Sequence, residues 1–124
     1  MNRTTPDTAT RDAIEACVRL YVQGAKEPGT DTLREAFREG ATIYGYFDGE
    51  LLEGPIDLFY EWHTANGPAT DVESRILLID HAETIATIRV ELDNWTGHDF
   101  SDILSLIRED GRWVIVNKLF HVRA

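Results

Sequence analysis

The segment from Asp99 to Val122, DFSDILSLIREDGRWVIVNKLFHV, constrains the fold of this chain more than any other part of it. Two apolar-rich runs flank an Asp110-Gly111 pair, which is typical of the turn of a β-hairpin. Most positions on both faces of this hairpin are apolar, but Asp102 and Lys118 interrupt the pattern. A carboxylate and an ammonium on paired strands of a largely buried sheet need partners or a pocket. The hairpin therefore predicts a packed sheet with a polar spot inside it.

Length and charge exclude several classes of protein. The 124 residues suffice for one domain that buries about two thirds of its unfolded surface. The net charge of −10 argues against nucleic acid and against an anionic membrane as partners, because both are recognised by Lys and Arg. No run approaches the ~18 apolar residues of a membrane span. The segment MNRTTPDTAT lacks the apolar core of a signal peptide, and we therefore expect a cytoplasmic protein.

Neither a metal nor a cofactor is expected. Cys17 is the single cysteine and lies on an apolar helical stripe, which favours a small core residue over a nucleophile. No Cys/His cluster has the spacing of a zinc site. The chain also has no Gly-rich phosphate loop, no Walker motif and no Ser-His-Asp order.

The periodicity of apolar residues predicts helices first and strands afterwards. Residues 1–6 resemble a disordered tail, and residues 7–124 are expected to form one domain. The predicted helices run from Asp7 or Thr8 to Lys26, from about Thr30–Thr32 onward, and from Gly54-Pro55 to Asn66. In the second helix, Thr32 and Glu35 have the spacing of a capping box. The predicted strands are 41–47, 50–53, 72–81, 83–95, 99–108 and 112–123.

This order of elements indicates an α+β fold. We expect three N-terminal helices packed on one face of a strongly curved antiparallel sheet. Such an arrangement forms a cone with an internal pocket.

Three motifs resemble the nuclear transport factor 2-like superfamily over roughly residues 8–122. They are VRLYVQGAKEPGTDTLREAF with GATIYGYFDGELLEG, EGPIDLFYEW, and FSDILSLIREDGRWVIVNKLFH. The superfamily includes ketosteroid isomerases, scytalone dehydratase and SnoaL-like polyketide cyclases. The last motif is most similar to the branch called putative lumazine-binding, where an Asp, a Gly-x-Trp turn and an Asn-Lys recur.

The resemblance implies two site residues and removes a third. Tyr21 and Asp102 lie where the isomerases have the tyrosine and the aspartate of their oxyanion hole. Their aspartate base, however, falls on Gly45, which argues against a steroid isomerase. Strand alternation places Val114, Val116, Lys118 and Phe120 on one face, which the resemblance assigns to the cavity together with Asp102 and Leu104. Lys118 near Asp102 would keep the carboxylate ionised, either as part of a polar ligand-binding triad with Tyr21 or as a self-satisfied buried ion pair.

The predicted third helix adds a titratable candidate. His63 shares a helix face with Phe59 and Trp62, and a histidine there suits proton transfer near neutral pH, although a surface or core-edge role is the commoner one. We expect Tyr44, Phe59, Trp62 and Trp95 to line the pocket beside Tyr21, Asp102 and Lys118.

The second face of the last strand also needs a partner. Trp113, Ile115, Asn117, Leu119 and His121 would share it, and it is too apolar for a solvent-exposed sheet face. Members of the superfamily commonly dimerise through the sheet, so we expect a homodimer; the alternative is that a crossing loop or a terminus covers this face.

Three functions remain open at this stage. The first is binding of a small molecule of unknown identity in an apolar pocket with a Tyr21/Asp102/Lys118 base. The second is a cofactor-independent lyase or isomerase, SnoaL-like or dehydratase-like, with His63 or Tyr44 as acid or base and Tyr21 polarising a carbonyl. The third is a protein-interaction scaffold with an incidental cavity. Binding is preferred because the carboxylate base is missing at Gly45.

Overall fold

Residues 7–124 are described by the structure, which is a computed structural model; the tail expected at residues 1–6 lies outside this range. Three helices and six strands follow one another in an α+β arrangement. The helices are α1 (Asp7–Lys26), α2 (Asp31–Ala36) and α3 (Asp57–Asn66). The strands are β1 (Phe37–Phe47), β2 (Glu50–Pro55), β3 (Glu73–Ala82), β4 (Ile85–Trp95), β5 (His98–Glu109) and β6 (Arg112–Val122).

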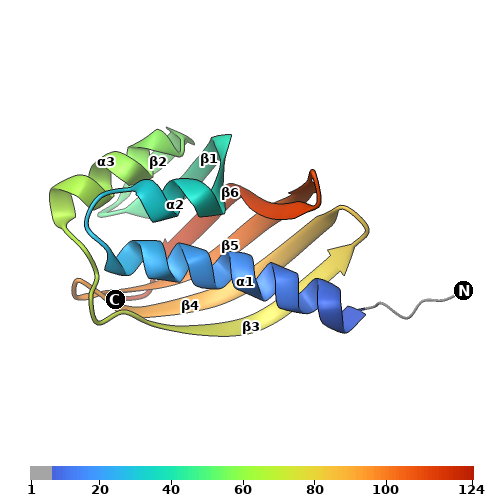
Figure 1. Cartoon of the computed structure of the whole chain (residues 1–124). Coiled ribbons are helices and arrows are strands. Elements are labelled where there is room, and N and C mark those ends of the chain that lie inside the picture. The colour runs from blue at the N-terminus through green and yellow to red at the C-terminus, as the bar shows by residue number, and fades with distance from the viewer. Residues whose placement is uncertain (1–6) are drawn as a thin grey trace, which may run out of the picture.

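All six strands form one open sheet in the order β2-β1-β6-β5-β4-β3. In Figure 1 the helix α1 runs across one face of the sheet, and α2 and α3 lie toward its β1–β2 end. The sheet is mixed, whereas an antiparallel sheet was expected: β1 pairs with β6 in parallel. The reason is topological, since β6 returns antiparallel to β5 and ends beside β1 only after the chain has passed through α3 and three further strands.

The start of β1 also differs from the prediction. The strand begins at Phe37 and not at Ala41, because Phe37 adopts an extended conformation directly after α2 and pairs with Ile115. The predicted capping box is absent: Thr30 is the residue before α2, and the hydroxyl of Thr32 donates to Oε1 of Glu27 at 2.6 Å. The α1–α2 corner is therefore held by a side-chain bond across the loop.

A β-bulge in β6 changes which residues face the core. Ser105 pairs with Asn117 and Leu106 with Ile115, so Val116 is an extra residue in the ladder. One extra residue reverses the inside-outside alternation on either side of it. Ile115, before the bulge, and Lys118, after it, consequently both point inward, with exposed fractions of 0% and 4%. The prediction that Trp113 and Ile115 lie on an outer face is wrong, because both are buried within the chain.

The core lies between the helices and the inner face of the sheet. Ile14, Val18 and Tyr21 of α1 are at most 1% exposed and belong to the same cluster as Ile88 and Leu104 of the sheet. Cys17 is buried there too, as expected. Within residues 7–124 no helix combines the length and apolarity needed to cross a membrane.

Candidate functional site

A buried polar triad joins α1 to the last two strands. Tyr21 donates its hydroxyl to Oδ2 of Asp102 at 2.6 Å. Nζ of Lys118 donates to the same Oδ2 and to the Tyr21 hydroxyl, both at 2.8 Å. The exposed fractions are 0% for Tyr21, 0% for Asp102 and 4% for Lys118. Asp102 and Lys118 therefore form an ion pair, and Tyr21 bonds to both partners.

Burial and the neighbouring carboxylate raise the pKa of Tyr21 well above its ordinary value of 10.0. Burial disfavours the phenolate, and the charge of Asp102 and the hydrogen bond to it act in the same direction. The phenol therefore stays protonated at neutral pH and acts as a hydrogen-bond donor toward Asp102. Oδ1 of Asp102 is buried without a hydrogen-bond partner among the described residues.

Aromatic rings surround the ammonium of Lys118. Its Nζ lies between 5.0 and 6.0 Å from five ring centroids, those of Tyr21, Phe59, Trp95, Phe100 and Phe120. A cation within about 6 Å of a ring centroid is attracted by the ring quadrupole, more strongly where water is excluded. Three elements of the sheet, α1 and α3 together hold this one nitrogen in place.

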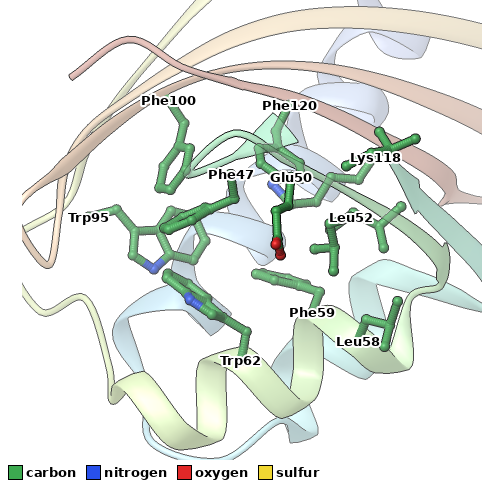
Figure 2. A pocket seen from close by; sticks show the side chains of 12 residues that line it. Phe47, Glu50, Leu52, Leu58, Phe59, Trp62, Trp95, Phe100, Lys118 and Phe120 are labelled. Carbon is green, nitrogen blue, oxygen red and sulfur yellow. The ribbon is translucent and has the colours of Figure 1, made fainter. Parts of the chain in front are cut away.

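A cavity of about 260 Å³ opens next to this nitrogen. Glu50 and Lys118 are its charged lining residues, and the other ten are apolar or aromatic. Figure 2 shows the side chains converging on this space, with the carboxylate of Glu50 pointing inward toward Phe59. The lining residues are Ile43, Phe47, Glu50, Leu51, Leu52, Leu58, Phe59, Trp62, Trp95, Phe100, Lys118 and Phe120.

Some of the expected site residues line the cavity, some lie behind Lys118, and two lie elsewhere. Phe59, Trp62, Trp95 and Lys118 line the cavity. Tyr21 and Asp102 do not line the cavity; both are hydrogen-bonded to Lys118, which does.

Tyr44 and His63 lie elsewhere. Tyr44 is 39% exposed and is not part of the lining. His63 is 1% exposed, outside the lining as well, and its Nε2 is 2.8 Å from the backbone oxygen of Glu27. This contact ties α3 to the loop directly after α1, which is the core-edge role of a buried histidine.

Glu50 is the functional candidate that sequence reasoning missed. It follows the Asp48-Gly49 turn, so the sequence marked it only as the first residue of a short return strand. Phe100 was also missed, although strand periodicity carried the signal: it lies two residues before Asp102 and hence on the same face of β5. Gly45 faces Phe120, where a Cβ would lie 2.4 Å from ring carbons, so the ring of Phe120 fills the space that a side chain at position 45 would need.

The open six-stranded sheet with helices packed on its inner face is the architecture expected of a nuclear transport factor 2-like protein. The family model described as "Putative lumazine-binding" matches residues 9–121, and the chain belongs to that family. The predicted superfamily and branch are thereby confirmed.

Known proteins similar to the chain cover most of its length. A nuclear transport factor 2-like protein of unknown function from Methylobacillus flagellatus KT is 40% identical, with a TM-score of 0.91 and 97% of each chain covered. The aldolase FrzH of a Cladobotryum species is 29% identical over 111 residues, which is 89% of each chain. A protein described as a ketosteroid isomerase candidate from Parabacteroides distasonis ATCC 8503 is 16% identical with a TM-score of 0.68 over 87% of this chain and 86% of its own, and shares the fold.

Proposed function

We propose that this protein binds a small molecule with an apolar, planar body and a polar end that accepts a hydrogen bond from Lys118. The observation that carries the proposal is the position of Lys118, which lines the cavity while Tyr21 and Asp102 fix its Nζ from behind. An ammonium has three donors, and two of them are used in these bonds. The third is available to a ligand atom in the cavity.

The cavity walls favour an aromatic ligand. Six of the lining residues are aromatic, and aromatic rings pack well on flat apolar molecules. They are Phe47, Phe59, Trp62, Trp95, Phe100 and Phe120. Apolar walls with a few polar groups at fixed positions are the usual make-up of a small-molecule site. Lumazine, in the family's name, is a fused heteroaromatic ring system with carbonyl oxygens, which fits both features. A cavity of this size also favours ligand binding over the hypothesis of a protein-interaction scaffold, which predicts a closed interior.

Calorimetric titration with three probes tests the binding proposal. We expect 2-naphthoate and lumazine to bind with one molecule per chain, and 2-methylnaphthalene to bind at least about tenfold more weakly, since a charge-assisted hydrogen bond contributes ~1.5–3 kcal/mol. Lys118→Met should remove this difference, whereas Lys26→Met, at an exposed position, should keep it. If none of the three probes binds saturably, the proposal is wrong.

Glu50 favours a second candidate, a cofactor-independent lyase or isomerase. Its carboxylate points into the cavity that Lys118 also lines, so a proton acceptor and a cationic donor could reach one ligand (Figure 2). Lys118 would polarise a carbonyl and Glu50 would take a proton from the adjacent carbon. The similarity to an aldolase supports this type of chemistry. Exchange of the methyl protons of 2-acetylnaphthalene for deuterium, followed by NMR, tests it: Glu50→Gln should abolish the catalysed exchange while 2-naphthoate still binds.

The outer face of the sheet supports the proposal of a homodimer, although the residues on this face are not the ones expected from the sequence. Successive strand pairings align Tyr44, Leu119, Ile103, Arg89 and Leu78 across five strands. The apolar members of this row are 39–54% exposed. A second copy packed on this row would bury a band that a soluble protein seldom leaves open. Trp113 and Ile115 take no part, because the bulge turns them inward.

A further inference from the structure

The chain contains far fewer lysines than arginines, yet the cation that lines the cavity is a lysine. The sequence contains ten arginines and two lysines, Lys26 and Lys118. Among the described residues, six of the seven ion pairs are made by arginine. The seventh, Lys118 with Asp102, is the pair at the cavity.

The two cationic side chains differ in reactivity. A guanidinium remains charged in proteins and offers a planar fork that suits buried ion pairs, so charge pairing alone favours arginine at such a site. A lysine amine can give up its proton and become a nucleophile toward carbonyl carbon. Of the two lysines, both within residues 7–124, the buried one is thus the one that lines the cavity.

We propose that Lys118 captures an aldehyde or ketone group of the ligand as a reversible imine. This inference rests on the proposed binding function and specifies the polar end of the ligand as a carbonyl. Lys118 is 4% exposed and aromatic rings surround its Nζ, so little bulk water reaches this nitrogen. Exclusion of water protects an imine from hydrolysis.

Lys118, Asp102 and the ligand carbonyl supply and accept every proton that imine formation requires. The ammonium of Lys118 passes one proton to Oδ2 of Asp102, which is 2.8 Å away, and the free amine lone pair forms a C–N bond as the carbonyl π bond breaks. One further proton moves from nitrogen to the oxygen, and the proton held by Asp102 accompanies the hydroxyl group as it leaves. The products are a protonated imine and one water. The positive charge ends on the same nitrogen, beside the same carboxylate and rings.

Tyr21 has a positioning role in this step. Its hydroxyl accepts from Nζ and donates to Oδ2, so it holds the amine and its proton acceptor at a fixed distance. The raised pKa of Tyr21 keeps its hydroxyl protonated, so the proton released by Nζ goes to the carboxylate of Asp102.

Reductive trapping tests the proposal on the unmodified protein. The chain is incubated with 2-naphthaldehyde and cyanoborohydride, and the modified residue is located by peptide mass mapping. We expect Lys118 to be labelled at least about tenfold faster than the exposed Lys26, because binding holds the carbonyl beside Nζ. An excess of 2-naphthoate should suppress labelling of Lys118 and leave Lys26 unaffected.

Two variants sharpen the test. Lys118→Arg keeps the charge and should abolish the fast labelling, and Lys26→Arg should leave it unchanged. If 2-naphthoate binds and Lys118 is labelled no faster than Lys26, the imine is wrong and the binding function stands. If 2-naphthoate does not bind and Lys118 is not labelled, both proposals are overturned.

Discussion

Nζ of Lys118 lies 2.8 Å from Oδ2 of Asp102, although the two residues are not directly opposite each other in the sheet. Asp102 of β5 pairs with Phe120, and Lys118 of β6 pairs with Leu104, so the ion pair runs diagonally across the two strands. A long side chain can span such a diagonal. The diagonal places Nζ among the rings of the cavity and leaves Phe120 free to form part of its wall.

Removal of the carboxylate charge should destabilise the fold. Asp102→Asn leaves the Lys118 ammonium buried without its counter-ion, and breaking a buried pair in this way costs ~3–5 kcal/mol. Urea unfolding of the variant measures the loss. The matched control is Glu109→Gln, which breaks the exposed pair with Arg38 and should leave the urea midpoint almost unchanged, because solvent screens exposed ion pairs. Equal stability of Asp102→Asn and wild type would contradict the ion pair.

The hydroxyl of Tyr21 contributes separately. Tyr21→Phe keeps the ring packing but removes one acceptor and one donor from a fully buried group. We expect a loss of ~1–3 kcal/mol, because the polar partners remain buried. Tyr44→Phe, at an exposed tyrosine, should have almost no effect on the same unfolding curve. A similar result for the two variants would remove Tyr21 from the network.

Alkaline pH should weaken the fold through Cys17. Burial raises the pKa of this thiol from 9.0 to about 12, with a smaller opposing effect of Arg112. Below pH 9 both folded and unfolded states are protonated and the stabilisation is fully present. It is lost as pH rises from 9 toward 12, since the unfolded state ionises first, at up to ~1.4 kcal/mol per pH unit. Cys17→Ala should show a shallower decline of urea stability over this range; parallel curves for the two proteins would argue against it.

A side chain at position 45 should conflict with the cavity wall. The Cβ of Gly45→Ala would lie 2.4 Å from the ring of Phe120 and 2.5 Å from its backbone oxygen. Such overpacking costs ~1–3 kcal/mol. In a double-mutant cycle Phe120→Ala should reduce the penalty, because it removes the ring contact and leaves the backbone one. Strict additivity of the two changes would show that Phe120 does not restrict position 45.

The outer row of the sheet predicts the oligomeric state. Leu119→Glu introduces a negative charge between Tyr44 and Ile103 of the row, and sedimentation should show a shift from dimer to monomer. Leu77→Glu is the control, because Leu77 is also exposed but is the bulged residue of the edge strand β3, outside the row. A dimer that survives Leu119→Glu would place the interface elsewhere.

The sequence by itself determined the elements and the polar spot. Helical periodicity located α1 and α3, Asp-Gly pairs located the β1–β2 and β5–β6 turns, and the interrupted apolar pattern singled out Asp102 and Lys118. These signals are local, or depend only on a repeat of two or 3.6 residues along one segment. The fold class and the lining by Phe59, Trp62 and Trp95 followed from them and from the family resemblance.

Only the tertiary structure decided the remaining features. The bulge at Val116 is a property of the pairing between two strands, and one extra residue there turns Ile115 from an expected interface into the core. Glu50 enters the cavity because the β1–β2 hairpin lies beside α3, a contact that no pattern within residues 50–55 encodes. The diagonal ion pair between Lys118 and Asp102 depends on the register of β5 and β6. The burial of both side chains depends on packing between segments distant along the chain.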